Sequence, residues 1–415
     1  MQNSLKYLIK KIKIKHISYS DYIGGAALAS KNINECLKEK INSKIIIRES
    51  KNNKLNNLKK INTYVRVILG KIPKIFHLNN FSKTQSFALI SSNLPKYINR
   101  DVDCFSITNL HWINRETLSI NDIFKIKTKI VWTCHDLWPF TGSYHLYYKN
   151  LTKYNLSNFQ RKFLNFDYWT LKRKKELFKK KKIYLIVPSK WMRKEALKNK
   201  VIKSNHIKVI GNPIDCKFWK KKEKYSSKKK LKLEKNLDFI LFGGTNIAND
   251  KNKGYNLAIK IFNNLKSKYK LNFKVLFFGS NNLDENEIKF PFKNYGFVEN
   301  KKILRYLYSV SELVLVTSKF ESFCQVAAEA QACSTPVIAY KTSGLNDVIK
   351  RGYSGYLINK YNHNLFSSKI YHFIKNKKKK LIMSKNARKF IKANYDYNII
   401  SKKYINFYKN IINDQ

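Results

Sequence analysis

Two glutamates, Glu321 and Glu329, stand eight residues apart in the stretch of the chain with the clearest chemical potential. An apolar run at 313–316 precedes them and predicts a buried parallel strand, after which a short loop carries Glu321. An alanine-rich helix is expected to carry Glu329 about two turns from its start. Two carboxylates beside the free N–H groups of a helix N-terminus suit a polyhydroxylated or phosphorylated ligand. Two ordinary surface glutamates on a solvated helix are the alternative at this point.

These residues need a scaffold, and strand-like runs alternate with helical ones over most of the chain. In the first half the expected strands are 12–18, 44–48, 104–109, 129–133, 183–187 and 207–210. After Gly211-Asn-Pro-Ile-Asp215 the alternation restarts, with strands expected at 239–242, 274–278, 313–316 and 337–340. Such alternation is typical of parallel sheets covered by helices. It predicts an α/β chain of two doubly wound halves that join near residue 216, with the lysine-dense residues 217–235 as a linker or a hinge-side loop.

The length of 415 residues exceeds one hydrophobic core and predicts more than one domain. The formal net charge of +56 would suit nucleic acid or an anionic surface. However, only ten of the 83 basic residues are arginines, and lysine is spread over the whole length. Because base recognition and bidentate phosphate binding favour arginine, we interpret the charge as compositional bias and expect no nucleic-acid partner. A basic nucleic-acid-binding protein is the alternative from another functional class.

A local basic block at residues 171–182 interleaves lysines with apolar residues. Each basic residue near an anionic leaflet contributes about 1 kcal/mol, so the block indicates either peripheral attachment to an anionic membrane surface or an ordinary solvated helix face. The six cysteines lie far apart and show neither Cys-x-x-Cys nor zinc spacing, which predicts free thiols in a reducing compartment. We expect a cytoplasmic protein without a bound metal, and the block allows a peripheral location on the inner face of the plasma membrane.

Several short motifs follow one another in a defined order. They are Gly24-Gly25-Ala26, Leu110-His-Trp-Ile-Asn114, His135-Asp-Leu-Trp-Pro-Phe-Thr-Gly142, Val187-Pro-Ser-Lys-Trp191, Gly211-Asn-Pro-Ile-Asp215, Phe242-Gly-Gly244, Lys253-Gly254, Gly296-Phe-Val298, the glutamate segment with Ala332-Cys-Ser-Thr-Pro-Val337, and Ser343-Gly-Leu-Asn-Asp347 with Gly352-Tyr-Ser-Gly355. With these motifs, residues 12–390 resemble the retaining glycosyltransferases of family 4 (glycosyl transferases group 1), which have the GT-B architecture. The resemblance implies an acceptor-binding Rossmann-like domain at 1–215, a nucleotide-sugar-binding one at 216–390, and a C-terminal helix at 391–415 that returns to the first domain.

The resemblance implies roles for the matching side chains. Glu321 would accept hydrogen bonds from the donor sugar and stabilise its developing positive charge, and Glu329 would hold the ribose hydroxyls. Lys253 would bind the departing diphosphate, a type of interaction typically worth about 3 kcal/mol. His135 would face the reaction centre, with a satisfied structural histidine as the alternative. His111 is a weaker candidate that is more often a packing residue at a strand end.

The resemblance also implies donor contacts from the backbone, where a chain without Cβ or a helix N-terminus can approach phosphate. For the first diglycine, a plain tight turn is the alternative. These donor-binding positions are Gly24, Gly25, Gly243, Gly244, Ser322, Phe323 and Cys324.

The chain departs from the family pattern in three places. Relatives often have glycine where Cys324 and Ser334 stand, so the helix between them is expected to begin differently here. An arginine usually precedes the phosphate-binding lysine, but residues 243–253 contain none, which leaves Lys251 as the candidate substitute. The His135 segment is often followed by a cysteine cluster, and here no cysteine stands between Cys134 and Cys216.

The resemblance therefore implies a retaining hexosyltransferase without cofactor or metal, which moves a sugar from a nucleotide-diphosphate sugar to a hydroxyl acceptor. The expected acceptor is a glycan, lipid-linked, in the synthesis of a cell-surface polysaccharide. An epimerase or a phosphorylase of the same architecture is the alternative among enzymes, although the chain shows no pyridoxal-lysine context. Asp101-Val-Asp103 formally matches the Asp-x-Asp of metal-dependent transferases with another fold, but it stands in the wrong order relative to the other motifs.

Overall fold

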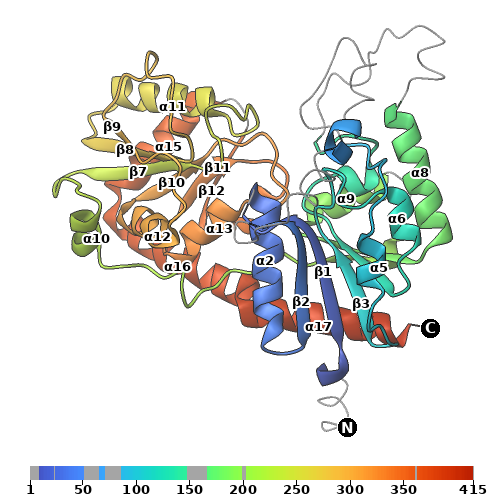
Figure 1. Ribbon diagram of the computed structural model, residues 1–415. Coiled ribbons are helices and arrows are strands. Elements are labelled where there is room, and N and C mark those ends of the chain that lie inside the picture. The colour runs from blue at the N-terminus through green and yellow to red at the C-terminus, as the bar shows by residue number, and fades with distance from the viewer. Residues whose placement is uncertain are drawn as a thin grey trace, which may run out of the picture. The chain divides into compact units, whose positions relative to one another are not determined.

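The computed structural model describes residues 9–22, 24–50, 65–70, 86–146, 166–198, 202–359 and 362–414. The chain forms two compact units, each with its own parallel sheet (Figure 1). The first unit contains Met1–Gly211 and Ser401–Gln415, and the second contains Asn212–Ile400. The expected fold class, α/β with two doubly wound parallel sheets, is confirmed.

The sheet of the first unit has six parallel strands in the order β2-β1-β3-β4-β5-β6. The chain builds outward from β1 to β2 and then restarts on the other side of β1 with β3, so the order reverses between β1 and β3. Such a switch point is where ligands of open α/β sheets bind, beyond the carboxyl ends of the strands. The strands are β1 (Lys13–Ser20), β2 (Asn42–Glu49), β3 (Ser106–Leu110), β4 (Lys129–Thr133), β5 (Ile183–Val187) and β6 (Ile207–Val209).

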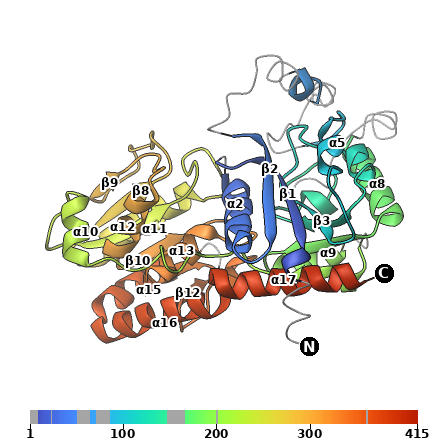
Figure 2. The same ribbon diagram turned by 60° about the horizontal axis from the view of Figure 1, so that its bottom comes forward.

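Helices pack on both faces of this sheet, whose central strands β3, β4 and β5 are almost fully buried, whereas β2 at its edge is only half-buried. The last helix belongs to this cover: Asn109 donates to the Tyr408 hydroxyl (2.8 Å), and Lys129 donates to the carbonyls of Ile411 and Ile412 (2.8 Å each) near the helix end (Figure 2). The named helices are α2 (Gly24–Lys38), α5 (Leu94–Ile98), α6 (Ile120–Phe124), α8 (Phe166–Lys180), α9 (Lys190–Lys198) and α17 (Tyr397–Asn413), with short 3-10 turns at Trp138–Phe140 and Ser204–His206.

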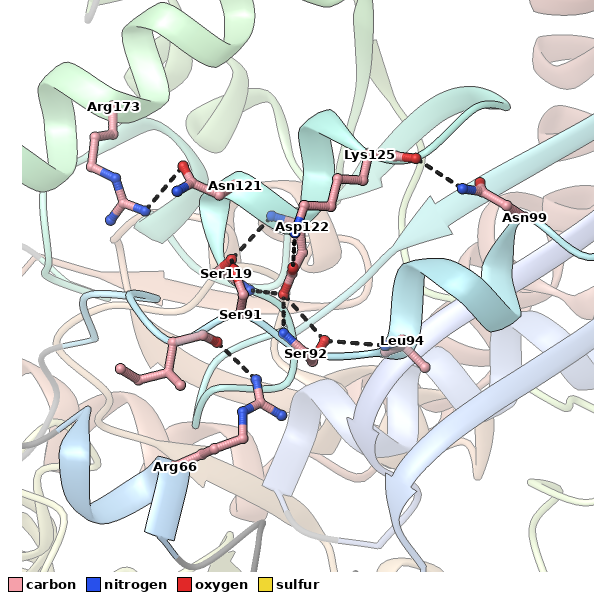
Figure 3. Close-up of polar contacts among 11 residues, drawn as sticks. Arg66, Ser91, Ser92, Leu94, Asn99, Ser119, Asn121, Asp122, Lys125 and Arg173 are labelled. Atoms are coloured by element: carbon pink, nitrogen blue, oxygen red, sulfur yellow. Dashed lines mark hydrogen bonds and ion pairs between the residues drawn. The ribbon is translucent and has the colours of Figure 1, made fainter.

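A capping box fixes the start of helix α6 (Figure 3). The Ser119 hydroxyl accepts from the backbone N–H of Asp122 (3.0 Å), and the Asp122 carboxylate accepts from the N–H of Ser119 (3.0 Å). The same carboxylate accepts from the N–H (2.8 Å) and hydroxyl (3.1 Å) of Ser92, which ties the preceding loop to the helix. Capping boxes of this kind satisfy two otherwise orphaned N–H groups at once.

The sheet of the second unit also has six parallel strands, in the order β12-β11-β10-β7-β8-β9. Here the order reverses between β7 and β10, which makes their carboxyl ends the switch point of this sheet. The strands are β7 (Asp238–Gly243), β8 (Phe273–Phe278), β9 (Phe292–Asn294), β10 (Leu313–Val316), β11 (Val337–Tyr340) and β12 (Gly355–Ile358).

The helices of the second unit enclose two apolar cores, one on each face of its sheet. Arg388 joins the elements of one face: its guanidinium donates to the carbonyls of Trp219 (2.9 Å), Cys216 (3.1 Å) and Ala332. A cation on the last carbonyls of a helix also complements the helix dipole. The helices are α10 (Lys224–Lys230), α11 (Tyr255–Lys268), α12 (Lys301–Val310), α13 (Gln325–Ala332), α14 (Leu345–Val348), α15 (His363–Lys375) and α16 (Lys377–Tyr395).

The interpretation of residues 217–235 as a linker or a hinge-side loop was wrong for the helical part of this segment. The segment contains α10, which Glu223 caps by accepting from the N–H groups of Tyr225 (2.7 Å) and Ser226. Lys228 turns inward and donates to the carbonyls of Lys235 (2.6 Å) and Leu237 (3.2 Å). A lysine-dense helix looks unpatterned in sequence because the long side chain can bury its stem while its ammonium finds carbonyl partners.

The basic block at 171–182 lies mostly on helix α8, and one of its lysines points inward. Lys174 is fully buried, donates to the carbonyls of Gly142 (2.6 Å) and Trp138, and lies 3.8 Å from the centre of the Trp138 ring. Burial holds the pKa of Lys174 well below its usual value, and Asp167 and Asp136 oppose that effect. No helix within the described part of the chain is long and apolar enough to cross a membrane.

Helix α13 lies between two residues with left-handed backbone. Cys324 before it has φ 81° and Ser334 after it has φ 60°. These are the two positions where relatives often carry glycine, which adopts positive φ without a Cβ clash. The two departures noted in the sequence therefore keep a glycine-like conformation at some cost in strain, and the helix still begins and ends there.

We expect Ser334→Gly to raise the free energy of unfolding by about 0.5–1 kcal/mol over Ser334→Ala. Removing the Cβ relieves about 1–2 kcal/mol of left-handed strain, and the extra freedom of glycine in the unfolded chain offsets part of it. Urea unfolding followed by circular dichroism would measure the difference. The alanine variant is the matched control because it keeps the Cβ but loses the hydroxyl. Equal unfolding midpoints for the two variants would contradict the strain.

Candidate functional site

The site of the second unit is built from two loops at the switch point of its sheet. One loop follows β7 and leads to α11, and the other follows β10 and leads to α13. Asn252 links them, because its amide donates to the carbonyl of Phe320 (2.8 Å) and accepts from the N–H of Phe320 (3.1 Å). The Thr317 hydroxyl adds bonds to the carbonyls of Lys253 (2.9 Å) and Gly254 (2.8 Å). These bonds hold the two expected charged residues at a set separation.

Lys253 and Glu321 form an ion pair across these loops, with 2.8 Å between Nζ and Oε1. Their side chains are 25% and 13% exposed, so the charges are largely out of water. Burial by itself would lower the pKa of Lys253, but the Glu321 carboxylate beside it raises the pKa well above its usual value. Lys253 is therefore a fixed cation. The structure brings together the residue expected to bind diphosphate and the residue expected to contact the sugar.

Glycine allows these loops to come so close. Gly254 caps α11 with φ 71°, and a Cβ there would stand 2.5 Å from the carbonyl oxygen of Thr317. Gly243, the last residue of β7, lies against the Phe278 ring, where a Cβ would stand 2.1 Å from a ring carbon. Gly244 follows, and its N–H already donates to the carbonyl of Phe278 (3.3 Å), so this N–H of the expected donor-binding diglycine is occupied.

The entry to helix α13 places the next group of expected residues. The N–H of Glu321 donates to the Ser343 hydroxyl (2.8 Å), and its carbonyl accepts from the N–H of Gly344 (2.8 Å). The side chain of Phe323 is buried in the core and meets the Tyr395 ring edge-on at 5.1 Å, which leaves only its backbone for a ligand. Ser322 stands between them on the same turn, half-buried.

Cys324 lies between the two carboxylates. Burial raises the pKa of its thiol well above the usual range, and Glu321 raises it further while Lys253 opposes the shift. The thiol is therefore uncharged and inert at neutral pH. Its left-handed backbone directs the chain into α13, whose first N–H groups follow at once.

Glu329 is the fifth residue of α13, so it lies about one turn inside the helix and not the expected two. Its carboxylate is buried and accepts from the Tyr308 hydroxyl (3.2 Å) and the Gln325 amide (3.2 Å). Burial raises the pKa of Glu329 to about 7, although Gln325, Lys301 and Tyr308 act in the opposite direction. The other amide atom of Gln325, Oε1, is buried without a hydrogen-bond partner. An acceptor left unpaired beside a carboxylate suits a ligand with neighbouring hydroxyls.

In the first unit, Gly24 and Gly25 are the first two residues of α2, directly beyond the carboxyl end of β1. A Cβ on either would meet no described atom within 4 Å, so the helix start is open to a ligand. Lys251, the expected substitute for the missing arginine, belongs to the second unit. Its side chain is exposed on the turn before Lys253.

His135 follows β4 and belongs to a network that the sequence did not reveal. Its Nε2 lies 2.9 Å from Nδ1 of His111, and His111 Nε2 lies 2.9 Å from Nδ1 of His16 on β1. His111, considered a packing residue, is therefore the direct partner of His135. Next in sequence, Asp136 binds Nδ1 of His145 (2.5 Å) and accepts from the Trp112 indole (3.0 Å). The spacing of these residues in sequence carries no signal, because three separate strands, β1, β3 and β4, deliver them.

The formal Asp-x-Asp pair has a structural role. The Asp103 carboxylate pairs with Lys13 (2.7 Å) and accepts from the Ser106 hydroxyl (2.7 Å) and the N–H of Phe105 (3.1 Å). Across the residues that the structure describes, no group of three or more His, Cys, Asp or Glu side chains could hold a metal ion.

The comparisons with known proteins agree with this geometry. Residues 222–390 match the family model described as glycosyl transferases group 1. An uncharacterized 41.2 kDa protein in the cps region of Klebsiella pneumoniae is 29% identical over 212 residues, which are 50% of this chain and 56% of that protein. The capsular polysaccharide biosynthesis glycosyltransferase CapM of Staphylococcus aureus is 26% identical over 236 residues, 53% of this chain and 61% of CapM. The chain thus spans little more than half the length of these curated relatives.

Solved structures cover nearly the whole chain. Anabaena HepE in complex with UDP-glucose has a TM-score of 0.67 at 15% identity and covers 96% of this chain and 100% of HepE. Sucrose-phosphate synthase from Thermosynechococcus elongatus has a TM-score of 0.67 at 16% identity, with 97% and 100% covered. At this identity the likeness shows the fold, which is GT-B. Residues 222–390, which include the Lys253–Glu321 pair and helix α13, are therefore similar to the glycosyl transferases group 1.

Proposed function

We propose that this protein is a retaining glycosyltransferase of family 4 that transfers a hexose from a nucleotide-diphosphate sugar to a hydroxyl acceptor in the synthesis of a capsular or related cell-surface polysaccharide. The observation that carries the proposal is the buried Lys253–Glu321 ion pair at the switch point, directly before the N-terminus of α13. The sequence similarity to the capsular glycosyltransferase CapM and to the cps-region protein supports a role in polysaccharide synthesis. A nucleotide-diphosphate sugar suits the site because it needs a cation, hydroxyl acceptors and free N–H groups in one place.

In the proposed reaction, the bond between the sugar C1 and the β-phosphate oxygen breaks, and a bond from the acceptor oxygen to C1 forms on the same face. The proton of the acceptor hydroxyl goes to the departing phosphate oxygen. Lys253 and the α13 N–H groups stabilise the negative charge that develops on the diphosphate, and we expect no metal to be needed for this. The Glu321 carboxylate accepts from sugar hydroxyls and stabilises the positive charge that develops at C1.

Glu329 would hold the ribose. Two neighbouring ribose hydroxyls can donate to its carboxylate, and the unpaired Gln325 Oε1 offers a further acceptor beside it. His135 would accept a hydrogen bond from a hydroxyl of the sugar or of the acceptor. The acceptor, a glycan on a lipid carrier, would bind to the first unit, as the resemblance to family 4 implies.

A peripheral location at an anionic membrane surface would bring the protein to such an acceptor. Helix α8 carries exposed Tyr168 (54%) and Trp169 (40%) at its start, and the Lys172 ammonium lies 5.1 Å from the Trp169 ring centre. Aromatic rings of this kind prefer the membrane interface, and lysines add attraction to anionic lipid. We therefore propose that α8 contacts the cytoplasmic leaflet.

Substitution of Glu321 tests its role in catalysis. We expect Glu321→Gln to lower kcat for sugar transfer about 100-fold, because it removes a charge that acts mainly in the transition state, equal to about 3 kcal/mol. The affinity for uridine diphosphate, which lacks the sugar, should change less than about threefold. Release of nucleotide from a panel of nucleotide sugars with a glycan acceptor would measure kcat. Glu285→Gln, at an exposed carboxylate of the same unit, is the matched control. Unchanged transfer by Glu321→Gln would remove Glu321 from the mechanism.

The pH dependence of nucleotide binding tests the role of Glu329. The pKa of Glu329 near 7 means that the carboxyl is partly protonated at neutral pH, whereas ribose hydroxyls bind best to the ionised form. Binding of uridine diphosphate should therefore lower this pKa and release a fraction of a proton, and affinity should fall as pH drops through 7. Calorimetry at pH 7 in buffers of different ionisation enthalpy would detect the proton. Glu329→Gln should abolish the release and Glu285→Gln should preserve it. Proton release that persists in Glu329→Gln would argue against a ribose site there.

Substitution of the exposed aromatic residues of α8 tests the membrane contact. We expect the double substitution Tyr168→Ser, Trp169→Ser to weaken binding to vesicles of phosphatidylcholine with phosphatidylglycerol about tenfold, since two interfacial aromatics are lost. Co-sedimentation would measure the binding. Tyr225→Ser, at a comparably exposed aromatic on α10 (58%), is the control. Equal retention of all variants on the vesicles would exclude α8 as the contact.

A further inference from the structure

Four neighbouring strands of the first unit each place one polar side chain in a single row. Ser43 lies on β2, His16 on β1, His111 directly after β3 and His135 directly beyond β4. These strands are adjacent in the order β2-β1-β3-β4, so the row runs diagonally across the sheet, from the start of β2 to the carboxyl ends of β3 and β4. Asn34 of helix α2 closes the row beyond Ser43.

Hydrogen-bond distances connect every member of the row. The Ser43 hydroxyl donates to Asn34 Oδ1 (2.8 Å) and lies 3.1 Å from His16 Nε2. His16 Nδ1 is 2.9 Å from His111 Nε2, and His111 Nδ1 is 2.9 Å from His135 Nε2. The planes of the last two rings differ by 17°, which suits an in-plane bond between ring nitrogens.

The three rings are neutral at physiological pH. Burial lowers the pKa of His16 to about 3 and that of His135 to about 4, and it holds the pKa of His111 well below the usual value. The charged group that faces His135 is Asp136, which raises its pKa but is itself engaged by His145. A neutral imidazole has one N–H and one lone pair, so each ring can donate to only one neighbour and accept from the other.

This restriction determines the direction of every bond. The single hydroxyl proton of Ser43 is used on Asn34, so Ser43 must accept from Nε2–H of His16. His16 Nδ1 then carries the lone pair and accepts from Nε2–H of His111. His111 Nδ1 in turn accepts from Nε2–H of His135, which leaves the lone pair of His135 on Nδ1. The amide oxygen of Asn34 therefore determines, through each bond in turn, which nitrogen of His135 carries the proton.

We propose that Asn34, Ser43, His16 and His111 are positioning residues that hold His135 in the tautomer with its proton on Nε2, so that Nδ1 presents a lone pair to the substrate. An imidazole in this state accepts a hydrogen bond from a hydroxyl but cannot donate one to a phosphate. The hydrogen bond on one ring nitrogen commonly sets the state of the other in this way. The inference rests on the proposed sugar transfer only for the identity of the hydroxyl, which belongs to the sugar or to its acceptor.

Nitrogen NMR of the full-length protein tests the row directly. With ¹⁵N-labelled histidine, a long-range ¹H–¹⁵N spectrum at pH 7.5 distinguishes protonated from lone-pair nitrogens in each ring. We expect all three rings to show a protonated Nε2 and a lone-pair Nδ1. A His135 ring protonated on Nδ1, or an equal mixture of both tautomers, would overturn the proposal.

Two substitutions at the start of the row add a causal test. Asn34→Asp keeps an oxygen acceptor for Ser43 and should leave the spectrum of His135 unchanged. Asn34→Leu removes the acceptor and frees the Ser43 hydroxyl to donate to His16, so the His135 signals should shift toward a tautomer mixture. Asn99→Leu, at an amide that donates to the carbonyl of Lys125 and accepts from the N–H of Lys127, is the matched control and should leave the row unchanged. Identical His135 signals in Asn34→Leu and the parent would contradict the relay.

Kinetics distinguish this proposal from the function itself. We expect Asn34→Leu to lower kcat about tenfold, the scale of a mispositioned proton acceptor, with KM for the donor nearly unchanged and with recovery in Asn34→Asp. A tautomer shift in Asn34→Leu with unaltered kcat would overturn the role of His135 in the reaction. Failure of the parent protein to transfer sugar from any nucleotide sugar would overturn the proposed function, whereas the nitrogen spectrum would still decide the tautomer.

Discussion

The ion pair between Lys253 and Glu321 is the constraint on which the second unit's site depends. Both side chains are largely buried, and a buried charge without its partner is costly to the folded state. The pair therefore keeps the loop after β7 and the loop after β10 together. The tight contact between Gly254 and Thr317 and the amide bonds of Asn252 hold the same two loops, and the left-handed turn at Cys324 leads from the second loop into α13. A diphosphate that approached Lys253 would meet a cation already fixed in place.

In the first unit, the polar groups near the switch point of the sheet are neutral histidines. At the switch point between β1 and β3, burial keeps the rings of His16 and His111 uncharged. Where no charge is present, the direction of the hydrogen bonds determines which atom of His135 is presented. The two units thus use different means, a paired charge in the loops after the strands in one and a row of oriented imidazoles across the sheet in the other. Both avoid an unpaired buried charge.

We interpret the lysine surplus as a compositional bias. Individual lysines nevertheless stabilise the fold. Lys174 lies against the Trp138 ring within the core, Lys129 binds the last carbonyls of α17, and Lys228 joins α10 to the following turn. An ammonium group with three donors can satisfy several carbonyls at once. The charge of the chain as a whole therefore says little about function, whereas the position of each lysine says much.

By itself, the sequence determined the parts that depend on local order. Apolar periodicity located ten of the strands in the two sheets, and the ordered motifs around His135, Lys253 and Glu321 indicated the GT-B fold and the candidate residues. Strand β9, Phe-Lys-Asn, escaped because it has one apolar residue, β12 was not predicted either, and α10 was hidden in a run of lysines. Only the tertiary structure decided that Glu329 lies one turn inside α13 and that His16, Ser43 and His111 stand in line with His135. The physical reason is that the order of strands in a parallel sheet decides which residues become neighbours. Residues on adjacent strands can be far apart in sequence, and their spacing along the chain does not reveal the contact.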